Sequence, residues 1–130
     1  MKLLLLTLFS TLLFSQNVEK FAQKNNYETD YKTAMKKAQK EHKDIMLVLV
    51  SEHCSWCKKL ENETLSDADV KKEVRKHYIP LILNRNERNF PEKFYSSFLP
   101  TIHFINYNNE NYFVTELGFR DKNDFLEYIK

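Results

Sequence analysis

Runs of apolar residues along the chain predict four strands. Residues 45–50 form an unbroken aliphatic run that is rich in β-branched side chains. Such a run is typical of a strand covered on both faces, so we expect it at the centre of a sheet. Further strands are predicted at 79–83, 101–107 and 112–117. Asparagines dominate the intervening segment 108–111, and asparagine tolerates the positive φ that a tight hairpin needs.

Apolar residues at helical spacing predict helices between and after these strands. From Asp30 to Lys43, residues Tyr31, Ala34, Met35 and Ala38 recur on one side, and we interpret the lysines on the other side as a solvated face. Further helices are expected at 55–64, at 67–77 with Ser66 or Asp67 as cap, at 90–98 with Pro91 in its first turn, and at 121–130 with Phe125, Leu126 and Ile129 inward. The polar segment 17–27 shows no clear periodicity and is either a short helix or a loose arm.

The lengths of the connections predict the topology. About 28 residues separate the first two strands and about 17 separate the second from the third, enough in both cases for a parallel crossover. The last two strands must be antiparallel. The expected order is β-α-β-α-β-β-α, which gives one α/β domain with a central mixed sheet of about four strands flanked by helices.

The first fifteen residues predict a secretory signal peptide. Lys2 supplies a positive start, and residues 3–14 are apolar apart from three hydroxyl side chains. As a helix this stretch would reach only ~18 Å, short of the ~30 Å hydrocarbon core of a membrane. We therefore expect cleavage near Ser15 and export, with an uncleaved membrane tether as the alternative. The expected organisation is a signal peptide at 1–15, an N-terminal arm at 16–29 and a folded domain at 30–130.

Composition excludes two broad classes of protein. The chain has 130 residues, of which 42% are hydrophobic and 29% are charged. This is the composition of a globular domain and not of a disordered chain. A formal net charge of +2 is too weak a bias to indicate nucleic-acid binding. The expected partners therefore include no nucleic acid, and we expect a monomer.

The chemistry of the sequence centres on its two cysteines, Cys54 and Cys57. They lie three residues apart where the predicted buried strand ends and the helix from Ser55 begins. Such a short loop constrains the unfolded chain little, so a structural disulfide is a poor explanation. The helix N-terminus favours thiolate at Cys54, and Cys57 shares the inner face of that helix. This pattern predicts an asymmetric redox couple in which Cys54 attacks and Cys57 resolves.

Metal binding by the cysteine pair is the main alternative. A zinc site needs four ligands, and the histidines that would have to complete it, His42, His53, His77 and His103, show no paired spacing. Haem attachment is excluded because Lys58, and not histidine, follows Cys57. We therefore expect no metal and no cofactor in the site.

From about residue 30 to the end, the chain resembles the thioredoxin superfamily. The segment Cys54-Ser55-Trp56-Cys57-Lys58-Lys59-Leu60-Glu61 is similar to that of the C-terminal domain of the transmembrane reductase DsbD and of related periplasmic thioredoxin-like proteins. Leu99-Pro100-Thr101 matches the family's cis-proline loop, and Gly118-Phe119 also fits the pattern. The resemblance implies a thioredoxin fold, a redox-active Cys54-Cys57 couple and a cis bond at Leu99-Pro100. The backbone of Leu99 could then pair with an extended substrate segment.

The sequence departs from the family at the buried acid. Val48 stands six residues before Cys54, where thioredoxins carry an aspartate. Glu61 matches a glutamate of the DsbD-like domain and is the best replacement proton acceptor, although an exposed helix carboxylate would have the same spacing. His53 could stabilise the thiolate or simply be solvated. Trp56 could shape a docking surface or only pack the helix.

The sequence thus predicts an exported thiol-disulfide oxidoreductase, a reductase or electron carrier for envelope proteins. Its expected partners are client proteins with disulfides and a membrane electron donor such as a DsbD-like reductase. The nearest alternatives are a disulfide oxidant or isomerase, and a metal-binding or chaperone module with the same fold.

Overall fold

The computed structural model describes residues 16–129, with the side chains of the first helix described from Val18 onwards. The predicted signal peptide lies outside the described residues. The elements in chain order are α1 (Gln16–Asn25), α2 (Tyr31–Glu41), β1 (Asp44–Val50), α3 (Ser55–Lys59), the π-helical η1 (Leu60–Leu65), α4 (Ala68–His77), β2 (Tyr78–Asn84), the short 3-10 turns η2 (Arg85–Glu87) and η3 (Glu92–Phe94), β3 (Thr101–Ile105), β4 (Phe113–Leu117) and α5 (Lys122–Ile129).

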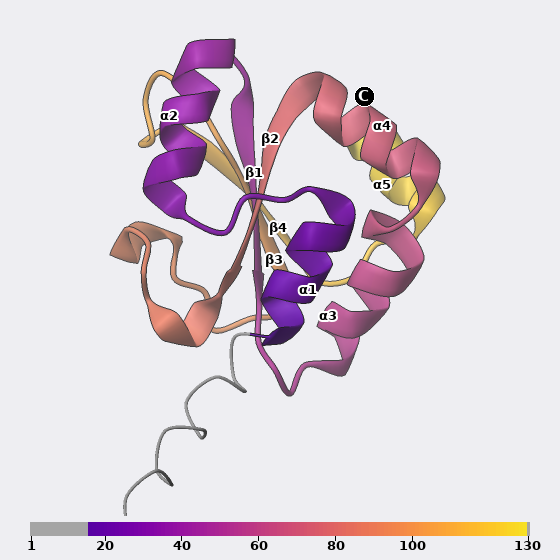
Figure 1. Cartoon of the computed structure of the whole chain (residues 1–130). Coiled ribbons are helices and arrows are strands. Elements are labelled where there is room, and N and C mark those ends of the chain that lie inside the picture. Colours follow the sequence, from indigo (N-terminus) through magenta and orange to yellow (C-terminus); the bar gives the residue numbers. More distant parts are fainter. Residues whose placement is uncertain (1–15, 130) are drawn as a thin grey trace, which may run out of the picture.

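The four strands form one mixed sheet in the order β2-β1-β3-β4. β1 pairs with β2 in parallel and with β3 antiparallel, and β4 is antiparallel to β3. Helix α2 lies on one face of the sheet, and α1, α3, α4 and α5 lie on the other (Figure 1). The chain therefore has a thioredoxin fold, with a four-stranded mixed sheet between helices.

Strand β1 is the centre of the core, as its aliphatic run predicts. Met46, Val48 and Val50 point into the cluster beneath α1, α3, α4 and α5. The alternate residues Ile45, Leu47 and Leu49 point into the cluster beneath α2. All six are essentially inaccessible to solvent. Since side chains alternate along a strand, this burial on both faces fixes the register of β1 and with it the position of the residues that follow Val50.

One connection differs from the prediction, because β3 runs antiparallel to β1 and the second crossover is not parallel. The segment between β2 and β3 contains only the turns η2 and η3, and the helix expected at 90–98 is reduced to Glu92–Phe94, with Pro91 as its N-cap. This segment stays near the end of the sheet where β1 finishes, since Thr101 pairs with Leu49. The start of β3 is thereby held beside the end of β1.

The N-terminal arm contains a helix. Of the two interpretations of this region, the short helix is correct: α1 packs Ala22 into the core, and Glu28 then bridges to Leu81 of β2.

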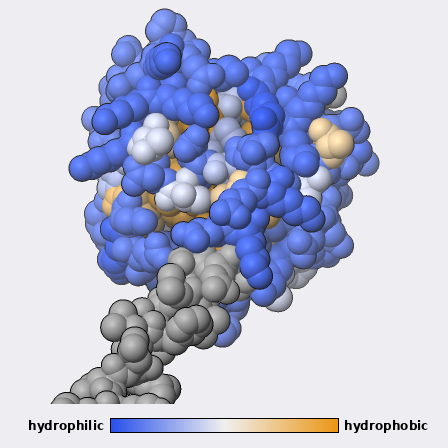
Figure 2. Space-filling model, in the orientation of Figure 1, coloured by the Kyte–Doolittle hydropathy of each residue, from blue (hydrophilic) through white to orange (hydrophobic). Residues whose placement is uncertain are grey.

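Much of the surface in the view of Figure 2 is hydrophilic, with apolar side chains only in separate patches. The lysine-rich side of α2 is exposed, as a solvated face should be.

The turn between β3 and β4 does not use positive φ at its asparagines. Among residues 16–129, the non-glycine residues with positive φ are Asn26, His42 and Arg88. Instead, Asn106 Oδ1 accepts hydrogen bonds from the backbone N–H groups of Asn108 and Asn109 at 2.8 and 2.9 Å. The side-chain amide thus closes the turn without a left-handed residue, so the expectation for 108–111 was wrong in its mechanism.

Candidate active site

The cysteine pair occupies the junction between β1 and α3. Cys54 is the N-cap of α3, and its Sγ accepts a hydrogen bond from the backbone N–H of Cys57 at 3.1 Å. The two cysteines form a disulfide with their Cα atoms 5.2 Å apart. Cys54 is partly accessible whereas Cys57 is fully buried. Because N–H groups at a helix start favour negative charge, the junction stabilises thiolate at Cys54 once the disulfide is reduced.

Cys57 lies in an apolar environment. It belongs to the same core cluster as Val48 and Leu60, and all three side chains are fully buried. Val48 therefore fills the position where a buried acid would have to stand, and it offers no proton acceptor. After Lys59 the helix widens from α to π geometry, so the helix predicted at 55–64 is continuous but not uniformly α-helical.

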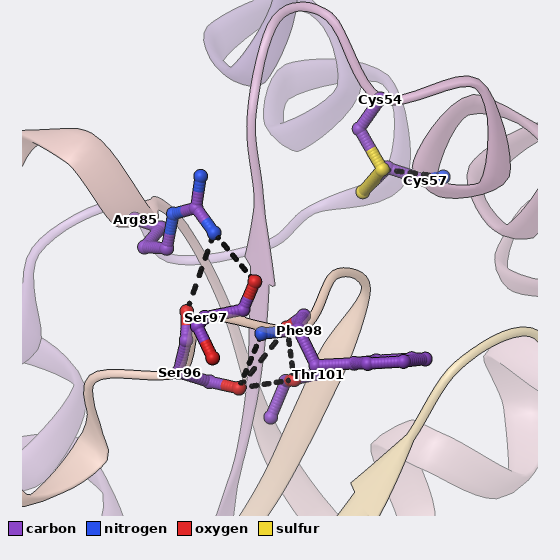
Figure 3. Close-up of a disulfide and its surroundings, with 7 residues drawn as sticks. All are labelled: Cys54, Cys57, Arg85, Ser96, Ser97, Phe98 and Thr101. Atoms are coloured by element: carbon purple, nitrogen blue, oxygen red, sulfur yellow. Dashed lines mark hydrogen bonds between the residues drawn. A yellow bond between two sulfur atoms is a disulfide. The ribbon is translucent and has the colours of Figure 1, made fainter.

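The loop before β3 lies on the same side of the domain as the disulfide (Figure 3). The expected cis bond between Leu99 and Pro100 is confirmed. Leu99 is partly exposed and packs against the same core cluster as Cys54. Pro100 is buried, and its C=O accepts a hydrogen bond from Gly118 N at 2.8 Å. Within the described part of the chain, no hydrogen bond involves the backbone N–H or C=O of Leu99, which leaves both groups free to pair with another segment.

Arg85 supports this loop, and sequence reasoning missed it. Its guanidinium donates to the backbone C=O groups of Ser96 and Ser97, at 3.4 and 3.0 Å (Figure 3). The hydroxyl groups of Ser96 and Thr101 lie 2.9 Å apart and hold the other side of the same turn. The only signal in the sequence was a basic residue directly after the second strand, which is also common on ordinary surfaces.

A small aromatic surface flanks the disulfide. Trp56 is 55% exposed and packs against Phe119, with ring centroids 5.8 Å apart. Lys59 Nζ lies 5.0 Å from the Trp56 ring centroid and 4.7 Å from that of Phe119. Thr64 holds the Phe119 loop in place by donating from Oγ1 to Arg120 O at 2.7 Å. Trp56 is thus fixed on the outer surface beside the disulfide and does not pack into the core.

Glu61 is partly buried on the side of the helix that faces α1. It contributes to an open cavity with residues of α1, including Lys24 and Asn25. Burial raises the pKa of Glu61 to about 7, and the charge of Lys58 opposes this shift. A carboxyl with a pKa near neutrality can both accept and return a proton under ordinary conditions.

The histidines do not converge on the cysteines. His53 adjoins Cys54 but is exposed. His42 stacks on Tyr107, and His103 is buried between Phe94 O and Thr115 Oγ1, at 2.8 Å from each. Between residues 16 and 129 there is no group of three or more His, Cys, Asp or Glu residues placed to hold a metal ion.

A second contact between strand ends positions the residues before the disulfide. Asn84, the buried last residue of β2, donates from Nδ2 to Glu52 Oε1 at 2.8 Å. Because β1 and β2 are parallel, their ends meet at one edge of the sheet, and this bond ties the Cys54 loop to that edge.

The fold, the CxxC disulfide at the start of a helix and the adjacent cis-proline loop define a thioredoxin-like protein with the arrangement of a thiol-disulfide oxidoreductase. Residues 31–130 match the family described as thioredoxin-like domain, and the chain belongs to that family. No curated protein sequence matches the chain.

Several solved structures share the fold. The C-terminal domain of DsbD from Neisseria meningitidis, in its oxidised form, superposes with a TM-score of 0.63 at 23% identity, over 78% of this chain and 95% of that one. A thioredoxin from Thermus thermophilus gives 0.62 at 19% identity, over 79% and 83% of the two chains. A DsbH oxidoreductase gives 0.61 at 17% identity, over 79% and 81%. In the described part of the chain, no helix has the length and apolar character that crossing a membrane requires.

Proposed function

We propose that this protein is an exported reductase or electron carrier that reduces disulfides in client proteins of the cell envelope. The observation that carries the proposal is the asymmetry of the couple: Cys54 is accessible at a helix N-terminus and Cys57 is buried behind it. Export is supported by the apolar leader at 1–15. The reducing direction is supported by the likeness of the segment around Cys57 to the DsbD-like domain.

The proposed reaction moves two electrons from the dithiol to the client. The Cys54 thiolate attacks one sulfur of a client disulfide, which forms a mixed disulfide and releases the other client sulfur as a thiolate that takes up a proton. Cys57 then loses its proton and attacks Cys54 Sγ. This step forms the Cys54–Cys57 disulfide and releases the second client thiol, so the client is reduced and the couple oxidised. A membrane dithiol donor such as a DsbD-like reductase would restore the reduced couple.

Glu61 is the proposed acceptor for the Cys57 proton. Helical spacing places it one turn after Cys57. Burial raises its pKa to about 7, so that it can accept and release a proton near neutral pH. Val48, an apolar member of the same buried cluster as Cys57, offers it no proton acceptor. His53 is exposed and has no role in this scheme beyond a favourable charge when it is protonated.

Client binding is assigned to the surface around the disulfide. Leu99 offers a free backbone N–H and C=O to an extended client segment, which would bind by adding a short strand. Trp56 and Phe98, 55% and 54% exposed, provide apolar contact area on this surface. We expect the protein to act as a monomer.

The proposal is tested by trapping. In Cys57→Ala the mixed disulfide through Cys54 cannot be resolved, so the variant should accumulate adducts with disulfide-containing clients that dithiothreitol releases. The matched control, Cys54→Ala, should trap far less because its remaining thiol is buried. Equal trapping by both variants, or none by either, would overturn the assigned roles.

A second assay separates the proposal from its alternatives. The protein should accelerate the reduction of insulin by dithiothreitol, and Cys54→Ser should not, because a metal-binding module has no need of thiol-disulfide exchange through Cys54. A soft-metal module would instead retain stoichiometric Cu(I) or Zn that Cys54→Ser loses. Tight stoichiometric metal in the reduced wild-type protein would contradict a purely redox role.

A further inference from the structure

An exposed apolar ridge lies beside the disulfide, and we define it by Trp56, Phe98, Leu117 and Phe119. Trp56, Phe98 and Leu117 are each more than half exposed, and the Trp56 and Phe119 rings pack with their centroids 5.8 Å apart. A Cβ atom at Gly118, the single glycine of the chain, would lie 3.5 Å from Phe98 Cε1, so the Phe98 ring rests directly on this residue. Gly118 joins Leu117 to Phe119, which makes the ridge one contiguous surface. Contiguous exposed apolar side chains are typical of an interaction site.

One cation is held against this ridge. Lys59 Nζ lies 5.0 Å from the ring centroid of Trp56 and 4.7 Å from that of Phe119, within the range in which an aromatic face attracts a cation. Glu63 Oε2 lies 4.0 Å from the same nitrogen, which is too far for a hydrogen bond. In the described part of the chain this is the one ion pair of Lys59, and it leaves the three N–H donors of the ammonium group available.

Neighbouring charges are engaged elsewhere. Arg120, directly after Phe119, donates from Nε to Glu116 Oε2 at 3.1 Å and forms its own ion pair. Lys58, the neighbour of Lys59 on the helix, instead lines the cavity beside α1. Lys59 is therefore the cation that contacts the aromatic rings of the ridge and still has donors to offer to another molecule.

We propose that Lys59 is a specificity-determining residue, which favours client disulfides that have an acidic side chain nearby in the client sequence. An apolar client residue would pack on the rings of Trp56 and Phe98, and the client carboxylate would accept a hydrogen bond from Lys59 Nζ. Because the ammonium group is already held over two rings, little of its freedom is lost when a carboxylate binds.

The position of Lys59 also limits where the acidic residue can stand. Lys59 follows Cys54 by five residues, which corresponds to about 8 Å along the helix at ~1.5 Å per residue. An extended client segment covers this distance in about two or three residues, at ~3.3 Å each. The favoured carboxylate should therefore lie about two to four positions from the client cysteine that Cys54 attacks.

The inference rests on the proposed function, because it names the clients of the same site. Lys59 would act on the recognition of the client and would leave the exchange reaction as it is. Its charge also acts on the Cys54 thiolate, but that effect is the same for every client. The ratio of rates between two clients that differ in one charge therefore isolates the proposed role.

The test compares two peptides that each carry one cysteine, blocked as a disulfide with a chromogenic thiol, and one apolar residue. They differ only in Glu or Gln three positions from the cysteine. The Glu-to-Gln ratio of rates with the reduced protein should be about 2- to 5-fold higher for wild type than for Lys59→Met, which keeps the apolar stem over the rings. The control Lys58→Met removes an adjacent charge and should retain most of the preference.

The outcomes separate this inference from the proposed function. Equal ratios for wild type and Lys59→Met, or an equal loss in Lys58→Met, would overturn the role of Lys59 while both peptides still react. If neither peptide reacted with the reduced wild-type protein, the proposed function itself would fail, and the inference with it.

A second measurement requires no reaction. Trp56 is the single tryptophan of the chain, so its fluorescence reports binding at the ridge. The disulfide form of the protein would be titrated with the same two peptides after their cysteine is replaced by serine. The Glu peptide should bind about 2- to 5-fold more tightly than the Gln peptide, and ~1 M salt should remove the difference by screening. Equal affinities at low salt, or a preference that persists in Lys59→Met, would overturn the proposal.

Discussion

The backbone N–H of Cys57 donates a hydrogen bond to Cys54 Sγ across 3.1 Å. This hydrogen bond caps α3 and directs the positive end of the helix dipole at the sulfur of Cys54, and not at the sulfur of Cys57. Cys57 itself is enclosed by apolar side chains, Val48 among them. The two thiols of the reduced protein should consequently differ in acidity as well as in access.

This asymmetry predicts the order in which the thiols ionise. In Cys57→Ala, the pKa of Cys54 should lie below the ordinary value of about 8.5, because the helix start stabilises its thiolate. In Cys54→Ala, burial should raise the pKa of Cys57 above that value. Thiolate absorbance or the pH dependence of alkylation measures both. If Cys57 ionised at lower pH than Cys54, the assigned roles would have to be exchanged.

Glu61 predicts a loss of stability of the disulfide form with rising pH. Burial raises its pKa from 4.5 to about 7, so the folded state favours the protonated carboxyl. This contribution is complete below about pH 4.5 and is lost as the pH rises through about 7. Glu61→Gln should therefore be more stable than wild type at about pH 8, by ~1–2 kcal/mol after allowance for partial solvation.

Denaturant unfolding of the disulfide form at about pH 5 and pH 8 measures this effect. Glu63→Gln is the matched control, since Glu63 is exposed and lies at 4.0 Å from Lys59 Nζ. It should change stability by a few tenths of a kcal/mol at most. A Glu61→Gln variant with the same pH dependence as wild type would argue against a shifted Glu61.

The burial of His103 should make the protein less stable as the pH falls, the opposite of the effect of Glu61. Burial lowers its pKa, and the contact with Phe94 O opposes the shift in part. The neutral imidazole is thus stabilised by folding, and this stability, present above about pH 6.5, is lost as the pH falls through the lower pKa of the folded state. In a Glu61→Gln background, His103→Gln should weaken the acid-side loss, whereas the control His77→Gln, at a more exposed site, should not. Equal acid sensitivity in both variants would exclude His103 as the cause.

Replacing Arg85 should slow client reduction without changing the pKa of Cys54. Arg85→Met removes the hydrogen bonds to the C=O groups of Ser96 and Ser97 that support the cis-proline loop. The rate of insulin reduction should fall about 3- to 10-fold while the Cys54 pKa stays the same. Arg88→Met is the control, because Arg88 pairs with Glu92 on the exposed surface. Comparable losses in the two variants would indicate a general surface effect.

Most of the fold could be predicted from the sequence because the spacing of apolar residues follows directly from which side chains are buried. The aliphatic run at 45–50 predicted a strand covered on both faces, and β1 is that strand. Asp67, one of two expected caps, accepts from Asp69 N and Val70 N at the start of α4. These features depend on neighbouring residues, which a single sequence displays.

Features set by distant contacts were not predictable in the same way. The direction of β3 depends on where the chain returns to the sheet, and a connection long enough for a helix contains only short turns. Arg85 acts on residues eleven and twelve positions away, and no local pattern marks that partnership. The shifted pKa of Glu61 likewise arises from its burial beside α1, a region that showed no periodicity.

The reduction potential of the Cys54–Cys57 couple, measured by equilibration with glutathione buffers, tests the central claim most directly. A reductase requires a reduction potential below that of the client disulfides it reduces. We therefore predict a value below about −200 mV, toward the value of about −270 mV that is typical of thioredoxin. A potential near about −120 mV, as in a strong disulfide donor, would contradict the account and reverse the assigned direction of electron flow.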